Sequence, residues 1–93
     1  LTAQKAEEIG LVSAAVPKED LWSAVLNMAK KIMKKGPLAL KLAKMVIHQG
    51  FETDMKSALM LEKLAQAILF GTEDKQEGIE AFLEKREPIF KGK

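Results

Sequence analysis

The sequence predicts an all-α fold, a small bundle of about four to five helices. Apolar residues recur at steps of three and four along several segments, which is the spacing of one helix face. Glycine or proline separates these segments, and only one short run resembles a strand. Of the 93 residues, 47% are hydrophobic and 30% are charged, which is typical of a globular domain rather than a disordered chain.

The N-terminal region predicts one short helix and one strand-like run. Thr2 is a favourable N-cap for a helix over residues 3–8. Gly10 ends this helix because glycine adopts the left-handed conformation at low cost. Residues 11–16 read as a strand that Pro17 terminates, although a single strand cannot form a sheet.

The second predicted helix runs from about Glu19 to Lys35 and carries a wide apolar stripe. Acidic residues begin it and four lysines end it, in agreement with the helix macrodipole. This electrostatic role explains the lysines better than contact with phosphate or a membrane surface does. Gly36 and Pro37 end this helix and begin the next.

The next two helices are predicted over residues 38–49, closed by Gly50, and over residues 55–70. Thr53 or Asp54 is the N-cap of the second of these. Residues 55–70 are apolar on most of their circumference, so the helix must be covered on more than one side. Two interpretations remain open: a central helix of the bundle, or a surface that faces a partner.

The last predicted helix lies between Gly71 and Pro88. Thr72 is its N-cap, and Glu73 and Asp74 occupy its first turn. On this helix Phe82 and Lys85 are three residues apart and therefore emerge side by side. Residues 89–93 form a short basic tail.

Several function classes are disfavoured by composition. The absence of cysteine excludes disulfides, thiolate metal sites and a cysteine nucleophile. A net charge of +2 does not favour a nucleic-acid partner, and no apolar run approaches the roughly 20 residues of a membrane span. No metal-ligand spacing is present, and the single His48 lies on a lysine-bearing, solvent-facing side. We therefore predict no metal site and no catalytic residue within the chain.

Three stretches resemble the crotonase superfamily, the enoyl-CoA hydratases and isomerases. AQKAEEIGLVSAAVP (3–17) resembles its "A..A...GLV..VVP" segment, and Gly36-Pro37-Leu38-Ala39 with Lys44 resembles "GP.A....K". TEDKQEGIEAFLEKREPIF (72–90) is similar to the closing "(T/S)ED..EG..AF.EKR.P.F" signature, which is the most specific of the three. The order and spacing match over nearly the whole chain.

This resemblance implies that residues 1–93 are the C-terminal helical, oligomerisation domain of a crotonase-like fold whose catalytic core lies elsewhere. The implied parent enzyme hydrates trans-2-enoyl-CoA to 3-hydroxyacyl-CoA in fatty-acid metabolism. It uses no cofactor, takes an acyl-CoA thioester as substrate and forms a homotrimer or homohexamer. We expect the chain to be a piece of a longer protein, inactive by itself, located in the cytoplasm or in a mitochondrial matrix if the source is eukaryotic.

The resemblance also implies substrate-binding residues that reach the acyl-CoA pocket of a neighbouring subunit: Phe70, Phe82 and Lys85. The alternatives are core packing for the two rings and simple solvation for the lysine. Some family members have tyrosine at the position of Phe70. The ring of Phe70 lacks the tyrosine hydroxyl group. A second hypothesis is a stand-alone helical interaction module without catalysis, and a weaker third is membrane-surface association through residues 19–35. The residues that set acyl-chain length and reaction type lie outside this sequence.

Overall fold

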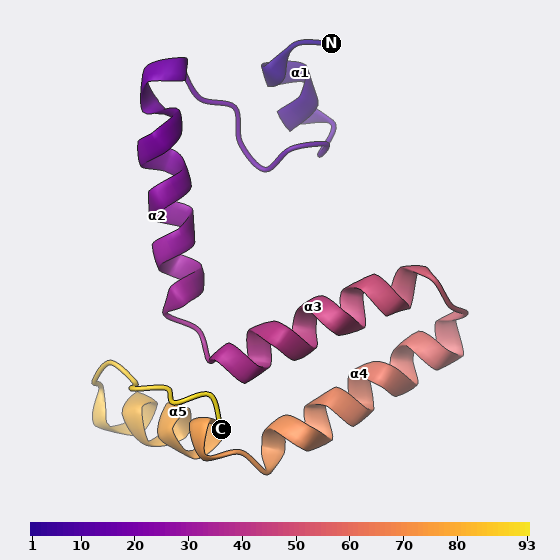
Figure 1. Cartoon of the computed structure of the whole chain (residues 1–93), viewed down its shortest axis with the longest axis vertical. Helices are drawn as coiled ribbons and strands as arrows, with labels where there is room; N and C mark the ends of the chain where they lie inside the picture. The colour runs from indigo at the N-terminus through magenta and orange to yellow at the C-terminus, as the bar shows by residue number, and fades with distance from the viewer. The chain divides into compact units, whose positions relative to one another are not determined.

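The computed structural model describes residues 1–93 and contains helices without strands, which confirms the predicted all-α class. The chain divides into two compact units, Leu1–Ile32 and Met33–Lys93. Along the chain follow α1 (Ala3–Glu8), the 3-10 turn η1 (Lys18–Asp20), α2 (Leu21–Met33), α3 (Pro37–Phe51), α4 (Met55–Phe70) and α5 (Glu73–Glu84) (Figure 1).

Helix α1 begins and ends as its sequence predicts. The Thr2 hydroxyl accepts a hydrogen bond from the Lys5 N–H at 3.1 Å. Gly10 follows the helix with φ of +76°, and the next N–H, that of Leu11, donates to the Ala6 carbonyl at 2.8 Å. This is the Schellman arrangement, in which a left-handed residue satisfies the last carbonyls of a helix. The predicted left-handed role of Gly10 is therefore confirmed.

The predicted strand over residues 11–16 is wrong. The Ala15 N–H donates to the Glu7 carboxylate at 2.8 Å, so the segment is tied to α1 by a side chain instead of by a strand ladder. Because the chain offers no second strand, backbone pairing has no partner. The apolar run is an irregular connection to η1.

Helix α2 is shorter than the predicted span of residues 19–35. Residues 18–20 form the 3-10 turn η1, and the regular helix covers Leu21–Met33. No residue of α2 is buried, and Trp22 is 71% exposed. The apolar stripe that the sequence predicts is therefore present but uncovered.

Helices α3 and α4 form an antiparallel pair within the second unit (Figure 1). Gly36 is the N-cap of α3 and Pro37 its first residue, as predicted. The predicted end at Gln49 is wrong, because the helix continues through Gly50 to Phe51. A Cβ placed on Gly50 would lie 3.7 Å from the Ala58 Cβ of α4. Packing between the helices thus outweighs the helix penalty of one glycine, which is about 1 kcal/mol.

Helix α4 has the predicted bounds, residues 55–70, and begins at Asp54. The Asp54 carboxylate accepts the Ser57 N–H at 3.0 Å and the Ser57 hydroxyl at 2.7 Å. No residue of α4 is buried. Its large apolar side chains are between 49% and 56% exposed at Leu59, Met60, Leu64 and Ile68. Within residues 1–93 α4 is therefore not a central helix, and its apolar side chains remain exposed.

Helix α5 begins as predicted, with the Thr72 hydroxyl accepting the Lys75 N–H at 3.2 Å. It ends at Glu84, and Lys85 follows in the left-handed conformation. The basic tail is not free: the residues Ile89–Lys93, here called the C-terminal strap, return to the start of α5 (Figure 1). The Phe90 ring of the strap lies 3.6 Å from the position that a Cβ on Gly78 would take.

Replacing Gly78 with alanine is expected to stabilise α5. Inside a helix, alanine is more favourable than glycine by up to about 1 kcal/mol in free energy of folding. The added Cβ would lie 3.6 Å from the Phe90 ring, which is ordinary van der Waals packing. Hydrogen exchange of the α5 amides should slow by up to about five-fold. Gly71→Ala, which changes a residue outside the helices, is the control and should have a smaller effect. Faster exchange in Gly78→Ala would mean that the strap cannot accommodate even a methyl group.

Candidate functional site

The two aromatic rings predicted to bind substrate are both on the surface. Phe70 is the last residue of α4 and is 58% exposed, and Phe82 on α5 is 83% exposed. Neither ring is buried within residues 1–93. The Lys75 ammonium lies 3.4 Å from the centroid of the Phe70 ring. Such a cation–π contact holds the ring and a positive charge together at one point of the surface.

Lys85 lies at the other end of α5 and has an uncommon backbone conformation. Its φ is 56° and its ψ 43°, and it is the only non-glycine residue with a positive φ. The Lys85 N–H donates to the Phe82 carbonyl at 3.3 Å, and the Arg86 N–H donates to the Ala81 carbonyl at 3.0 Å. Neither an ion pair nor a hydrogen bond engages the Lys85 ammonium.

The three predicted residues do not converge on one point. Phe82 and Lys85 both lie at the C-terminal end of α5, Phe82 in its last turn and Lys85 directly after it. Phe70 precedes the N-terminal end of the same helix, and at 1.5 Å per residue the two ends are roughly 18 Å apart. A ligand that touches all three residues must therefore be extended.

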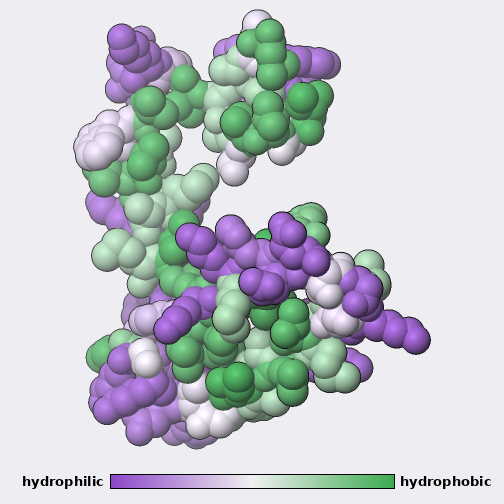
Figure 2. Space-filling model, turned by 45° about the vertical axis from the view of Figure 1, so that its right-hand side comes forward, coloured by the Kyte–Doolittle hydropathy of each residue, from purple (hydrophilic) through white to green (hydrophobic).

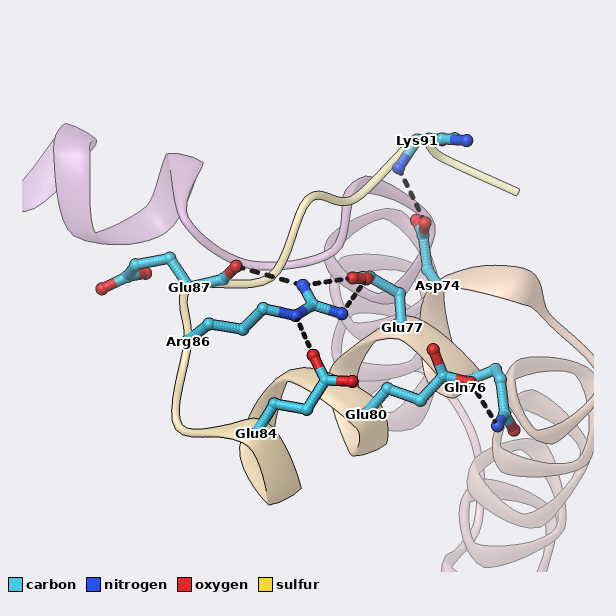
Figure 3. A network of polar contacts seen from close by, with 8 residues as sticks. All are labelled: Asp74, Gln76, Glu77, Glu80, Glu84, Arg86, Glu87 and Lys91. Atoms are coloured by element: carbon cyan, nitrogen blue, oxygen red, sulfur yellow. Dashed lines mark hydrogen bonds and ion pairs between the residues drawn. The ribbon is translucent and has the colours of Figure 1, made fainter.

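Arg86 forms a cluster with two glutamates that we call the Arg86 brace: Glu77, Glu84 and Arg86 (Figure 3). Its guanidinium lies 2.6 Å from a Glu77 oxygen and 2.5 Å from a Glu84 oxygen. The hydrogen bond from Arg86 lowers the pKa of Glu77, and the two carboxylates raise the pKa of Arg86. Because the Glu77 pKa is depressed, the pairing stabilises the fold above about pH 4.5 and is lost as the pH falls through the lowered value.

The C-terminal strap depends on Asp74, which is 8% exposed. Its two carboxylate oxygens accept the N–H groups of Lys91 and Gly92, each at 2.7 Å. Figure 3 shows the first of these two hydrogen bonds. The Asp74 N–H donates in return to the Lys93 carbonyl at 2.8 Å. The sequence predicts only that Asp74 lies in the first turn of α5. The signal that could have found its second role is the fixed spacing of Asp74 and Phe90 in the closing signature.

A small cavity of about 280 Å³ lies beside the strap. Phe90 forms one wall, Gly78 and Lys75 of α5 another, and Leu69 of α4 a third. Its surface is almost entirely apolar. The cavity adjoins the Phe70–Lys75 pair through Lys75 but does not include Phe82 or Lys85.

An apolar groove of about 230 Å³ follows the α3–α4 pair. Exposed side chains line it, among them Met45, Leu64 and Ile68. Hydrophobic atoms also reach the surface over much of the face in Figure 2. Exposed apolar surface of this extent is typical of an interaction face.

The ionisable groups with defined environments serve the fold. The Ser57 hydroxyl and N–H lower the pKa of the Asp54 carboxyl, which is the opposite of what a general acid at neutral pH requires.

His48 is exposed, as predicted. No cluster of three or more potential metal ligands occurs in residues 1–93, and none of the helices has the length and hydropathy needed to cross a bilayer.

Comparison with known proteins gives consistent matches over the entire chain. The family model for enoyl-CoA hydratase/isomerase matches residues 1–93. The 2,3-dehydroadipyl-CoA hydratase of Escherichia coli is 41% identical over 93 residues, which is 100% of this chain and 36% of that protein. The crotonyl-CoA hydratase of Syntrophomonas wolfei is 40% identical over 90 residues, or 97% of this chain and 35% of the relative.

A solved structure agrees with the sequence matches. The crystal structure of an enoyl-CoA hydratase from Bacillus anthracis is similar over 100% of this chain and 36% of its own, with a TM-score of 0.94 and 41% identity. The chain thus spans about a third of the length of the relatives that it matches.

Proposed function

Because the chain belongs to the enoyl-CoA hydratase/isomerase family, we propose that it is the C-terminal helical part of an enzyme that hydrates a trans-2-enoyl-CoA thioester to 3-hydroxyacyl-CoA. The match of all 93 residues to about a third of the relatives' length carries this proposal. The reaction belongs to fatty-acid metabolism and needs no cofactor. The cytoplasm, or the mitochondrial matrix of a eukaryote, is the proposed location.

The proposed chemistry needs groups that this chain does not bring together. Hydration of an enoyl thioester requires N–H donors for the developing oxyanion and carboxyl groups that move protons. In residues 1–93, Asp54 caps a helix, Asp74 holds the strap and Glu77 pairs with Arg86. We therefore assign catalysis to residues outside this chain and expect residues 1–93 alone to be inactive.

The proposed contribution of this chain to substrate binding lies at the ends of α5. The exposed Phe82 ring suits stacking on an adenine, and the free Lys85 ammonium suits a phosphate of CoA. Phe70, at the other end, would contact a different part of the extended thioester. The bound substrate is proposed to belong to a neighbouring subunit.

We further propose that the exposed apolar faces of this chain form contacts of a homotrimer or homohexamer. The uncovered apolar side chains of α2 and α4 support this. A stand-alone interaction module would use the same surface. An activity assay of the complete protein separates the two hypotheses, because only the first expects turnover.

The test measures crotonyl-CoA hydration by the complete protein and by the isolated chain of 93 residues. We expect turnover only from the complete protein. In that protein Lys85→Ala should weaken CoA binding by about ten-fold, because it removes a charged partner of a phosphate. Lys63→Ala, which removes an exposed lysine of α4, is the matched control.

Hydration by the isolated chain at a rate near that of the complete protein would refute the assignment of catalysis to residues elsewhere. Unchanged CoA binding in Lys85→Ala would remove this lysine from the binding site.

A further inference from the structure

We propose that Arg86 is a positioning residue, and that its brace to Glu77 and Glu84 holds Lys85 in the orientation that meets a phosphate of CoA. The inference rests on the proposed function, since it concerns the same binding site. It adds residues that the resemblance did not assign to binding. Arg86 itself touches no ligand in this proposal and acts only through its neighbour.

The first observation is the backbone of Lys85. Glycine, and less often asparagine, normally fills the left-handed position that ends a helix in the Schellman arrangement. Here a lysine fills it, with φ of 56°. A side chain with a Cβ disfavours this conformation, so surrounding contacts must hold it.

The second observation is that contacts fix the chain on both sides of Lys85. Before it, Glu84 is paired with the Arg86 Nε at 2.5 Å. After it, the Arg86 N–H donates to the Ala81 carbonyl at 3.0 Å, and Nη2 donates to Glu77 at 3.3 Å. Because Glu77 lies about two turns earlier on α5, the guanidinium ties the turn back to the body of the helix (Figure 3).

The third observation is the different use of two adjacent cations. The Arg86 guanidinium has carboxylates on two sides, so its charge is committed to the fold. The Lys85 ammonium is engaged by neither an ion pair nor a hydrogen bond and remains available. A planar guanidinium with five donors can bridge two carboxylates, whereas an ammonium lacks this fork geometry. The structure thus pairs the Arg86 guanidinium with carboxylates and leaves the adjacent Lys85 ammonium unpaired.

The experiment compares Arg86→Gln, Lys85→Ala and the double variant in the complete protein. Isothermal titration gives the Kd for CoA and for CoA lacking its 3′-phosphate, and steady-state assays with crotonyl-CoA give kcat and KM. We expect Arg86→Gln to raise the Kd for CoA about five- to ten-fold and to raise KM with little change in kcat. The double variant should bind no more weakly than Lys85→Ala, because both changes remove one interaction. Arg86→Lys should restore binding in part.

Glu80→Gln is the matched control, because Glu80 lies on the same helix but contacts Gln76 at 2.9 Å and not Arg86 (Figure 3). Should Arg86→Gln fail to fold, Glu77→Gln and Glu84→Gln each remove one side of the brace and should each raise the Kd. Weaker binding in Lys85→Ala together with unchanged binding in the brace variants would overturn the inference. An additive loss in the double variant would also overturn it, since Arg86 would then contact CoA directly. Unchanged binding in Lys85→Ala would instead refute the proposed site.

Discussion

Replacing Asp74 with alanine is expected to release the C-terminal strap from α5. The carboxylate accepts two N–H groups at 2.7 Å from residues 17 and 18 positions later, while it is 8% exposed. Hydrogen bonds to a charged acceptor contribute about 1.5–3 kcal/mol each, and solvent can hydrate part of what is lost. We expect the strap to lose about 2–4 kcal/mol of local stability.

Hydrogen exchange of the Lys91 and Gly92 amides measures this loss directly. Exchange should accelerate by roughly 30-fold or more, because 2 kcal/mol corresponds to about that factor. Glu73→Ala is the control, since it removes the neighbouring carboxylate of the same helix turn, which makes no hydrogen bond to the strap. Asp74→Asn should lie between the two, because an amide has only one oxygen to accept an N–H. Unchanged protection in Asp74→Ala would show that Phe90 packing alone holds the strap.

Replacing Leu64 with lysine is expected to prevent assembly through α4. Leu64 is 55% exposed and lines the apolar groove of the α3–α4 pair, so the helix can accept a polar side chain without losing a buried contact. A charge inside an apolar interface loses hydration and has no partner. The expected cost to association is about 2–4 kcal/mol, or roughly 30- to 1,000-fold in Kd.

Sedimentation velocity over a range of concentrations provides the measurement, applied both to the isolated chain and to the complete protein. The unmodified chain should self-associate, because its apolar faces are exposed. Leu64→Lys should shift it toward the monomer, whereas Lys63→Ala, one residue away, should not. Circular dichroism should show equal helix content in all three. A monomeric unmodified chain with a sharp thermal transition would contradict the proposed role of this surface.

The helices were predictable because their signals are local. Asp54 and Thr72 as N-caps and Gly10 in the left-handed conformation follow from side-chain chemistry within a few residues. The errors arose where the outcome depended on distant parts of the chain. Residues 11–16 had strand propensity but no strand to pair with, and Gly50 stayed helical because α3 packs on α4.

The candidate site likewise has some features that local spacing predicts and others that it does not. Helix spacing predicts that Phe82 and Lys85 emerge side by side, but Lys85 lies just beyond the helix in the left-handed conformation, where that spacing does not hold. The separation of Phe70 from Lys85 follows from the bounds of α5. The roles of Asp74 and Arg86 could not be derived from helix periodicity, because the partners of Asp74, and Arg86 itself, lie beyond the helix end, where the sequence does not specify the direction of the chain. The strap also explains the spacing in the closing signature, since Asp74, Gly78 and Phe90 meet in space.

The contacts of Asp74 have a practical consequence for protein engineering. A cut by a protease before Lys91, or a stop codon placed there, would delete the partners of three main-chain hydrogen bonds at once. The Asp74 carboxylate would then have only water as a partner in place of the Lys91 and Gly92 N–H groups. Shortening this end for crystallisation would therefore remove an ordered structural element and not a disordered tail.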